Sequence, residues 1–197
     1  MKILLYGINF APELTGIGKY TGEMAAWLSA AGHEVRVITA PPYYPDWAVW
    51  PGHSARRYTK TSWQGVTVFR TPLWVPKRVS GAKRLLHLAS FAAASAPALL
   101  AQWRWKPDVV WVTEPPLACT PAALAFARLN GAAAWLHVQD YEVDAAFDLG
   151  MLKGRRLRQL VTATERWLMR RFDRVSTISG RMVERAIAKG IDPARVV

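Results

Sequence analysis

The chain contains few cysteines and few acidic residues. It also lacks the residue spacings that are typical of metal sites and of serine nucleophiles. Its one cysteine, Cys119, excludes an intrachain disulfide and fits a reducing compartment. Only four apolar residues follow Lys2 before Gly7, too few for a signal peptide. No His, Cys, Asp or Glu group has metal-ligand spacing, and no serine lies in a nucleophile elbow. We therefore expect a disulfide-free protein without a metal centre.

Acidic residues are missing from a stretch of 61 residues between Asp46 and Asp108. The stretch carries ten Lys or Arg and six of the ten tryptophans, in a chain of net charge +12. Basic side chains are attracted to anionic surfaces, and tryptophan rings suit the headgroup layer of a membrane. The pattern favours an anionic membrane surface as partner, and a solvated basic face is the alternative. Nucleic acid is not expected, because no recognised binding motif accompanies the charge.

One run inside this stretch, residues 85–103, has no charged residue. Its length approaches the roughly 20 apolar residues that span a bilayer. It is mostly alanine, however, and it contains the polar or helix-breaking residues His87, Ser90, Ser95, Pro97 and Gln102. We expect a helix that packs on a sheet or lies in the membrane interface, anchored by the basic residues of 77–84.

The rest of the chain alternates between β-type runs and helical patterns, and 51% of its residues are hydrophobic. β-type runs occupy 2–6, 34–39, 57–61, 66–70, 108–113, 133–139 and 174–179, and 57–61 with 66–70 predicts a hairpin. Helical patterns lie between them; the first would bury Tyr20, Met24, Trp27, Leu28 and Ala31. The sequence predicts an α/β fold, a Rossmann-like α/β/α sandwich with a mostly parallel sheet.

Ligands of such sheets bind outside the carboxyl ends of the strands. The loop after the first strand is longer than the roughly 2–6 residues that a βα turn needs. Its glycines allow close backbone approach, and amide groups at a helix start favour an anion, although a packing role stays open. Lys19 either contacts phosphate or is solvated. The substrate-binding candidates at these strand ends are Glu13, Thr15, Gly16, Gly18, Lys19, Tyr43, Glu114 and Glu142.

The pattern Gly16-x-Gly18-x-x-Thr21 departs from the dinucleotide fingerprint, because the third glycine is missing. The second strand also ends at Thr39-Ala40 without the acid that would bind a ribose. A nucleotide-cofactor oxidoreductase is therefore disfavoured.

Two residues are candidates for catalysis. Asp140 falls just past a strand end, where a carboxylate accepts a proton or orients a hydroxyl; capping of a following helix is its alternative role. His137 lies near the end of the same strand, and both a packed core histidine and a catalyst remain open for it.

Several runs together carry a resemblance to a known family. Residues 7–21 (GINFAPELTGIGKYT) and 32–45 (GHEVRVITAPPYYP) resemble the amino-terminal half of group 1 (family four) glycosyltransferases. Residues 107–110 (PDVV), 136–144 (LHVQDYEVD) and 178–182 (ISGRM) extend the match over essentially the whole chain. Among these enzymes the chain is most similar to those of colanic-acid-type exopolysaccharide synthesis.

The resemblance implies a GT-B enzyme with two Rossmann-like domains. Residues 1–197 would be the acceptor-side domain, and a donor-binding domain that holds the nucleotide-sugar would be absent from this chain. The reaction would retain anomeric configuration and need no metal or cofactor. Acceptors in such pathways are often lipid-diphosphate-linked saccharides, which implies a cytoplasmic protein, peripheral at the inner face of the cell membrane. The isolated chain would be inactive.

The resemblance also bears on single residues. The loop of Gly16 and Gly18 would face the donor diphosphate or the acceptor. Many relatives have a His-Asp pair where this chain has Gln139-Asp140, so Asp140 carries more weight here than His137. The rival interpretation from another class is a non-catalytic module that binds membrane surfaces.

Overall fold

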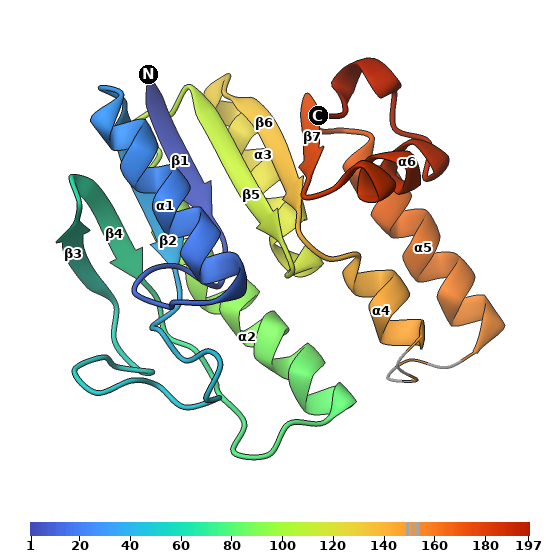
Figure 1. The fold of residues 1–197 in the computed structure, drawn as a ribbon, viewed down its shortest axis with the longest axis horizontal. Coiled ribbons are helices and arrows are strands. Elements are labelled where there is room, and N and C mark those ends of the chain that lie inside the picture. The colour runs from blue at the N-terminus through green and yellow to red at the C-terminus, as the bar shows by residue number, and fades with distance from the viewer. Residues whose placement is uncertain (149, 151, 153) are drawn as a thin grey trace.

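The computed structural model describes residues 1–148, 150, 152 and 154–197 of the chain (Figure 1). Strands and helices alternate along the described residues. In chain order they are β1 (Lys2–Tyr6), α1 (Gly16–Ala30), β2 (Glu34–Thr39), β3 (Thr59–Trp63), β4 (Val66–Arg70), α2 (Gly81–Leu100), β5 (Val109–Glu114), the 3-10 turn η1 (Leu117–Cys119), α3 (Thr120–Asn130), β6 (Ala133–Val138), α4 (Glu142–Asp148), α5 (Arg155–Met169), β7 (Arg174–Thr177), α6 (Gly180–Ala188) and the 3-10 turn η2 (Pro193–Arg195).

The strands form one sheet of seven in the order β3-β4-β2-β1-β5-β6-β7. Every pair is parallel except the β3–β4 hairpin, which turns at Gln64-Gly65 as predicted. Helices lie on both faces, with α1 in front of the sheet and α3 behind it in Figure 1. The predicted α/β/α sandwich with a mostly parallel sheet is confirmed.

Two hydrophobic clusters fill the space between the layers. The smaller lies between α1 and the sheet and includes Leu5, Ala25 and Val37. The larger joins α2 and α3 to the other face through residues such as Phe91, Phe126 and Leu136. These packed layers bring the carboxyl ends of β1, β2, β5 and β6 to one edge of the sheet, the lower edge in Figure 1.

Helix α1 buries only part of the predicted face: Met24 and Leu28 pack against the smaller cluster, and the others do not. Tyr20 and Trp27 are 59% and 68% exposed, whereas small residues, Thr21 and Gly22 among them, face the sheet. A Cβ on Gly22 would lie 2.9 Å from the Ala11 Cβ, so the helix and the loop after β1 approach too closely for a larger residue. The prediction for Tyr20 and Trp27 was wrong because hydrophobicity was given more weight than close backbone packing.

The charge-free run forms α2, which packs on the sheet and buries His87, Leu88, Phe91, Ser95 and Leu99. The expected packing of this helix on the sheet is therefore confirmed. Among the described residues, no helix is long and apolar enough to cross a membrane.

The tryptophans of the acid-free stretch are mostly part of the folded body. Trp105 is only 7% exposed, and the Arg36 guanidinium lies 4.3 Å from the centroid of the Trp105 ring. The Trp63 ring packs on the Phe10 ring. Only Trp74 and Trp103 of the six are exposed. Trp105 is buried and so cannot belong to a membrane headgroup anchor, whereas Trp47, Trp50 and Trp63 are half-buried.

Candidate functional site

A cleft of about 380 Å³ opens at the carboxyl edge of the sheet. It is lined from the loops after β1, β2, β5 and β6 and from one side of α2. Of the predicted site residues, Gly16, Tyr43 and Asp140 line it. The sequence therefore located the right edge of the sheet, where open α/β sheets bind ligands.

Glu13 lies beneath the cleft and joins two of its loops. Its carboxylate accepts hydrogen bonds from the backbone N–H groups of Tyr43 and Tyr44, at 2.9 and 3.0 Å, and from Asn9 Nδ2 at 2.9 Å. Burial raises the pKa of Glu13, and these three donors oppose the rise. The side chain is 2% exposed, so Glu13 positions the loops and does not face a ligand.

The predicted glycine loop divides into a part that faces the cleft and a part that supports it. Gly16 lines the cleft with a φ of +57°, a left-handed conformation that favours glycine. A Cβ on Gly18 would come within 2.7 Å of the Glu13 Cβ, so Gly18 is required for packing. Thr15 is the N-cap residue of α1 and makes no side-chain capping bond, and Lys19 pairs with Glu23 at 3.7 Å on the surface.

An aromatic wall closes one side of the cleft, and its central ring, His87, was not predicted from the sequence. The buried His87 ring of α2 lies 4.8 Å from the Tyr43 ring and 5.1 Å from the Trp47 ring, centroid to centroid. His87 Nδ1 lies 2.7 Å from the Trp74 carbonyl oxygen, which only accepts, so Nδ1 carries the proton. Burial lowers the pKa of His87, which keeps the ring neutral. His87 Nε2 is buried and has no hydrogen-bond partner among the described residues.

Asp140 is the exposed carboxylate of the cleft. It follows β6 and lines the cleft beside Gln139, whose backbone N–H donates to the Glu114 carbonyl oxygen at 3.0 Å. That bond continues the pairing of β5 with β6 beyond the strand ends and fixes where the next residue emerges. Asp140 therefore stands at a defined position with its carboxylate free to orient a hydroxyl group.

His137 does not line the cleft. Its Nδ1 lies 2.8 Å from Ser176 Oγ on β7, and its ring lies 5.1 Å from that of Trp111. Burial lowers the pKa of His137 to about 4. Of the two roles left open for this histidine, the structure favours the packed, hydrogen-bonded residue.

Two further predicted residues, Glu114 and Glu142, are also withdrawn from the cleft. Glu142 accepts a hydrogen bond from the Leu117 backbone N–H at 2.7 Å and so fixes the start of η1. Glu114 is fully buried, and neither of its carboxyl oxygens has a partner among the described residues. Burial and the nearby Glu165 and Glu142 carboxylates raise the pKa of Glu114 well above its usual value. Glu114 is therefore held as a neutral acid.

The cleft thus combines aromatic rings, an exposed carboxylate and the cation of Arg84. Arg84 belongs to the basic segment of 77–84 that the sequence singled out. Its position beside the strand ends could not be predicted, because it depends on how α2 packs across the sheet. Within 1–148, 150, 152 and 154–197, no three His, Cys, Asp or Glu side chains gather as a metal site would require.

Comparison with known families decides what kind of protein carries this cleft. The model of the glycosyl transferase 4-like domain matches residues 15–197. The chain belongs to the glycosyl transferase 4-like family. The match covers α1 and every later element, and with them the cleft residues from Gly16 onward.

A curated relative from Escherichia coli (strain K12) is named "Putative colanic acid biosynthesis glycosyl transferase WcaI". It is 56% identical over 200 residues, which cover 100% of this chain and 49% of the relative. The chain thus spans about half the length of this relative.

Solved structures with a related arrangement have low sequence identity. One is the "putative UDP-N-acetylglucosamine 2-epimerase from Listeria monocytogenes", with a TM-score of 0.48 and 12% identity over 98% of this chain and 44% of that one. Another is Os79 from O. sativa, in complex with UDP and deoxynivalenol-3-glucoside. Its TM-score is 0.47, with 14% identity over 92% of this chain and 47% of that one.

Proposed function

We propose that the chain is the acceptor-binding domain of a glycosyltransferase of exopolysaccharide synthesis. In the longer protein it would serve to move a sugar from a nucleotide-sugar to a saccharide. The observation that carries the proposal is an aromatic cleft with an exposed carboxylate at the carboxyl edge of the sheet, in a chain of this family. The 56% identity to a relative named for colanic acid biosynthesis supports this type of pathway.

The lining of the cleft suits a saccharide. Tyr20 and Tyr44 are 59% and 39% exposed at its mouth and offer faces on which a sugar ring can pack. Gly16 opens α1, so the first amide groups of that helix are available to a phosphate oxygen. Arg84 adds a positive charge for the same group. These features fit an acceptor that consists of a sugar joined to a diphosphate.

The proposed chemistry assigns Asp140 to the acceptor hydroxyl. During transfer the bond between the anomeric carbon and the donor phosphate oxygen breaks, and a bond to the acceptor oxygen forms. The Asp140 carboxylate would orient that hydroxyl and accept its proton as the oxygen becomes the nucleophile, and nucleoside diphosphate would leave. Retention of anomeric configuration and independence of a metal ion belong to the proposal. Most contacts to the nucleotide-sugar would come from residues outside this chain.

We place the protein peripherally at the cytoplasmic face of the cell membrane, with a lipid-linked acceptor. The segment before and into α2 supports this placement, because Lys77, Arg78 and Lys83 are exposed there next to the cleft residue Arg84. Exposed basic residues of this kind are attracted to anionic lipid, each contributing about 1 kcal/mol near the surface.

The test uses Asp140→Asn in the full-length protein. Release of nucleoside diphosphate from a panel of nucleotide-sugars is followed with lipid-linked saccharides extracted from the producing cells. Loss of the carboxylate should reduce turnover by at least about 100-fold, within the range of a positioned acid–base group. Asp148→Asn is the matched control, because this exposed acid lies outside the cleft.

Unchanged turnover in Asp140→Asn, with both variants folded by circular dichroism, would remove Asp140 from the mechanism. No turnover by the unmodified full-length protein with any donor would favour the rival function, a non-catalytic module that binds membrane surfaces. The exposed basic residues before α2 support that rival equally, so only the enzymatic measurement separates the two.

A further inference from the structure

Helix α5 extends beyond the body of the domain. Its last turns are packed, with Glu165, Leu168 and Met169 buried. Its first six residues, 155–160, are all exposed, and among them Leu157 and Leu160 are 39% and 66% exposed. Because α-helical residues three to four apart share a face, Leu157 and Leu160 continue the stripe that Leu168 buries further along the helix. The apolar face of α5 is therefore left uncovered over its first two turns.

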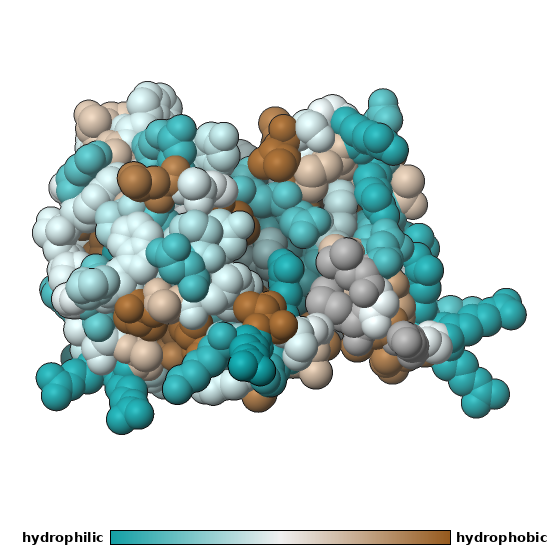
Figure 2. All heavy atoms as spheres, turned by 60° about the horizontal axis from the view of Figure 1, so that its bottom comes forward, coloured by the Kyte–Doolittle hydropathy of each residue, from teal (hydrophilic) through white to brown (hydrophobic). Residues whose placement is uncertain are grey.

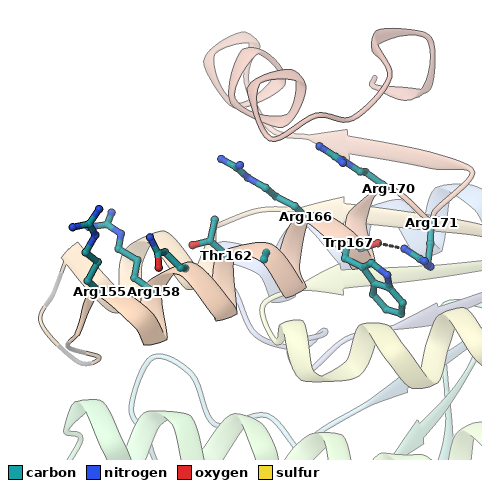
Figure 3. A pocket seen from close by; sticks show the side chains of 9 residues that line it. Arg155, Arg158, Thr162, Arg166, Trp167, Arg170 and Arg171 are labelled. Atoms are coloured by element: carbon teal, nitrogen blue, oxygen red, sulfur yellow. Dashed lines mark hydrogen bonds between the residues drawn. The ribbon is translucent and has the colours of Figure 1, made fainter.

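The opposite side of the same helix is strongly basic. Arg155, Arg158, Arg166 and Arg170 project along it and line a groove of about 660 Å³ made only by α5 and the residues directly after it (Figure 3). Trp167 lies between the two sides and is 54% exposed, with the Arg171 guanidinium 3.5 Å from its ring centroid. A helix with leucine and tryptophan beside a continuous basic face is typical of membrane-interface helices.

Acidic side chains compensate this charge only weakly. Asp148 lies 3.7 Å from Arg158, and both side chains are more than half exposed, so their attraction is screened by water. Glu165 points into the protein, where it pairs with Lys189. The basic face of α5 thus keeps most of its charge for an external anionic partner.

The start of α5 lies at the lower edge of the molecule in Figure 1, as does the start of α2. In Figure 2, which brings this edge forward, long hydrophilic side chains project beside exposed hydrophobic patches. Around α2 the exposed residues are Lys77, Arg78 and Lys83, together with Val79 and Leu86, which are 47% and 57% exposed. Two separate segments therefore present the same mixture of basic and apolar side chains at the edge where the cleft opens.

We propose that the first half of α5 is a membrane-docking helix that lies in the headgroup layer of an anionic phospholipid bilayer. Leu157 and Leu160 enter the boundary between headgroups and acyl chains, and the arginines contact lipid phosphates. Together with the segment around Lys83, α5 orients the cleft toward the bilayer. The proposal rests on the proposed function, because a lipid-linked acceptor would reach the cleft from that side.

The decisive experiment measures how deeply single positions of α5 enter a vesicle. Leu160→Cys carries a polarity-sensitive dye; the native Cys119 is fully buried and is not labelled in the folded protein. Leu129→Cys is the control, since this residue is 70% exposed at the end of α3, at the opposite edge. We expect the dye at 160, and not at 129, to shift to the blue with phosphatidylcholine–phosphatidylglycerol vesicles. No shift at 160, or equal shifts at both positions, would overturn the proposal.

Vesicle sedimentation gives an independent measurement without a dye. Arg155→Glu with Arg158→Glu, two arginines of the groove, should weaken binding to anionic vesicles by at least about tenfold, because each reversal replaces attraction to the surface by repulsion. The control with the same charge change is Arg104→Glu with Lys106→Glu, whose side chains are exposed at the opposite edge. Equal losses in both pairs would mean that only net charge matters, and would overturn a specific role of α5.

A second copy of the chain is the competing occupant of the apolar face. If Leu157→Ser with Leu160→Ser dissociates a dimer of the unmodified protein, measured by light scattering, the face is a protein interface and the membrane proposal fails. None of these measurements uses turnover. Failure of docking therefore leaves the transferase assay unaffected, and failure of that assay leaves docking intact.

Discussion

Three carboxyl groups around the cleft differ in exposure, and the difference decides what each can do. Asp140 is exposed and lines the cleft, so it is available to a substrate hydroxyl. Glu13 is buried but accepts three hydrogen bonds, so it fixes the surrounding backbone. Glu114 is buried with no hydrogen-bond partner among the described residues and is therefore held neutral. The sequence favoured Asp140 as a catalytic residue and gave Glu13 and Glu114 only as substrate-binding candidates. Burial and hydrogen bonding separate the roles of the three.

The neutral state of Glu114 predicts an effect of pH on stability. Its pKa in the folded protein is raised well above the usual 4.5 by burial and by the Glu165 and Glu142 carboxylates. Above pH 4.5 the unfolded chain releases this proton and the folded chain keeps it, so the free energy of unfolding falls as pH rises. Glu114→Gln keeps the size of the side chain and removes this loss.

Urea unfolding at a series of pH values measures the difference between Glu114→Gln and the unmodified protein. The free energies of unfolding of the two proteins should differ least below pH 4.5. As the pH rises above 4.5, the variant should become more stable relative to the unmodified protein. The same pH dependence in both proteins would show that Glu114 ionises normally in the folded state.

At the scale of elements, the cleft depends on how the loops after β1 and β2 are joined. Glu13 belongs to the first loop and accepts the backbone N–H groups of Tyr43 and Tyr44 in the second. Arg70, at the end of β4, donates to the carbonyl oxygens of Ala40 and Ala11 at 2.7 and 2.5 Å and so ties the same two loops from another side. Two buried charged residues thus hold one wall of the cleft in place.

Glu13→Ala should lower the free energy of unfolding by about 3 kcal/mol, because it leaves buried N–H donors without acceptors. Glu13→Gln keeps one acceptor oxygen and should cost less. Chemical denaturation of both variants beside the unmodified protein gives the comparison. A loss of under about 1 kcal/mol in Glu13→Ala would show that water or loop movement replaces these bonds.

The sheet and most helices could be predicted from the sequence, because their apolar periodicity is strong and local. The run 66–70 matches β4 residue for residue, whereas α4 (Glu142–Asp148) was indicated only as a helix that Asp140 would cap. Its seven residues contain four acidic or aromatic side chains and too few turns for periodicity to appear. The inward face of α1 was predicted only in part, through Met24 and Leu28, because small residues make its closest contacts.

The candidate site was predictable only where it follows directly from strand ends. Asp140 directly follows a predicted strand, Gly16 and Tyr43 belong to the predicted loops after two others, and all three line the cleft. His87 reaches the cleft from the middle of a long helix, and nothing local in the sequence marks which face of α2 turns there. Long-range packing therefore brings His87 into the lining of the cleft and keeps Glu114, Glu142 and His137 out of that lining.

In the whole molecule, exposed basic residues and the opening of the cleft lie at the same edge of the sheet. The exposed basic residues before α2 and at the start of α5 lie at the edge where the strands end and the cleft opens. The chain spans 49% of a curated relative, so its proposed role is one side of a larger catalytic site. On this account the described domain supplies the acceptor site and the surface that brings a lipid-linked acceptor to it.

The central claim is that the cleft binds a saccharide acceptor, and backbone amide NMR of the isotope-labelled chain tests it most directly. Oligosaccharides released from the exopolysaccharide are titrated into the protein. We expect saturable shifts of the amides of Gly16, Tyr44 and Asp140, with no change at Leu100 and Leu129 on the opposite edge. Shifts confined to other surfaces, or none at the highest saccharide concentration, would contradict the assignment of this cleft as the acceptor site.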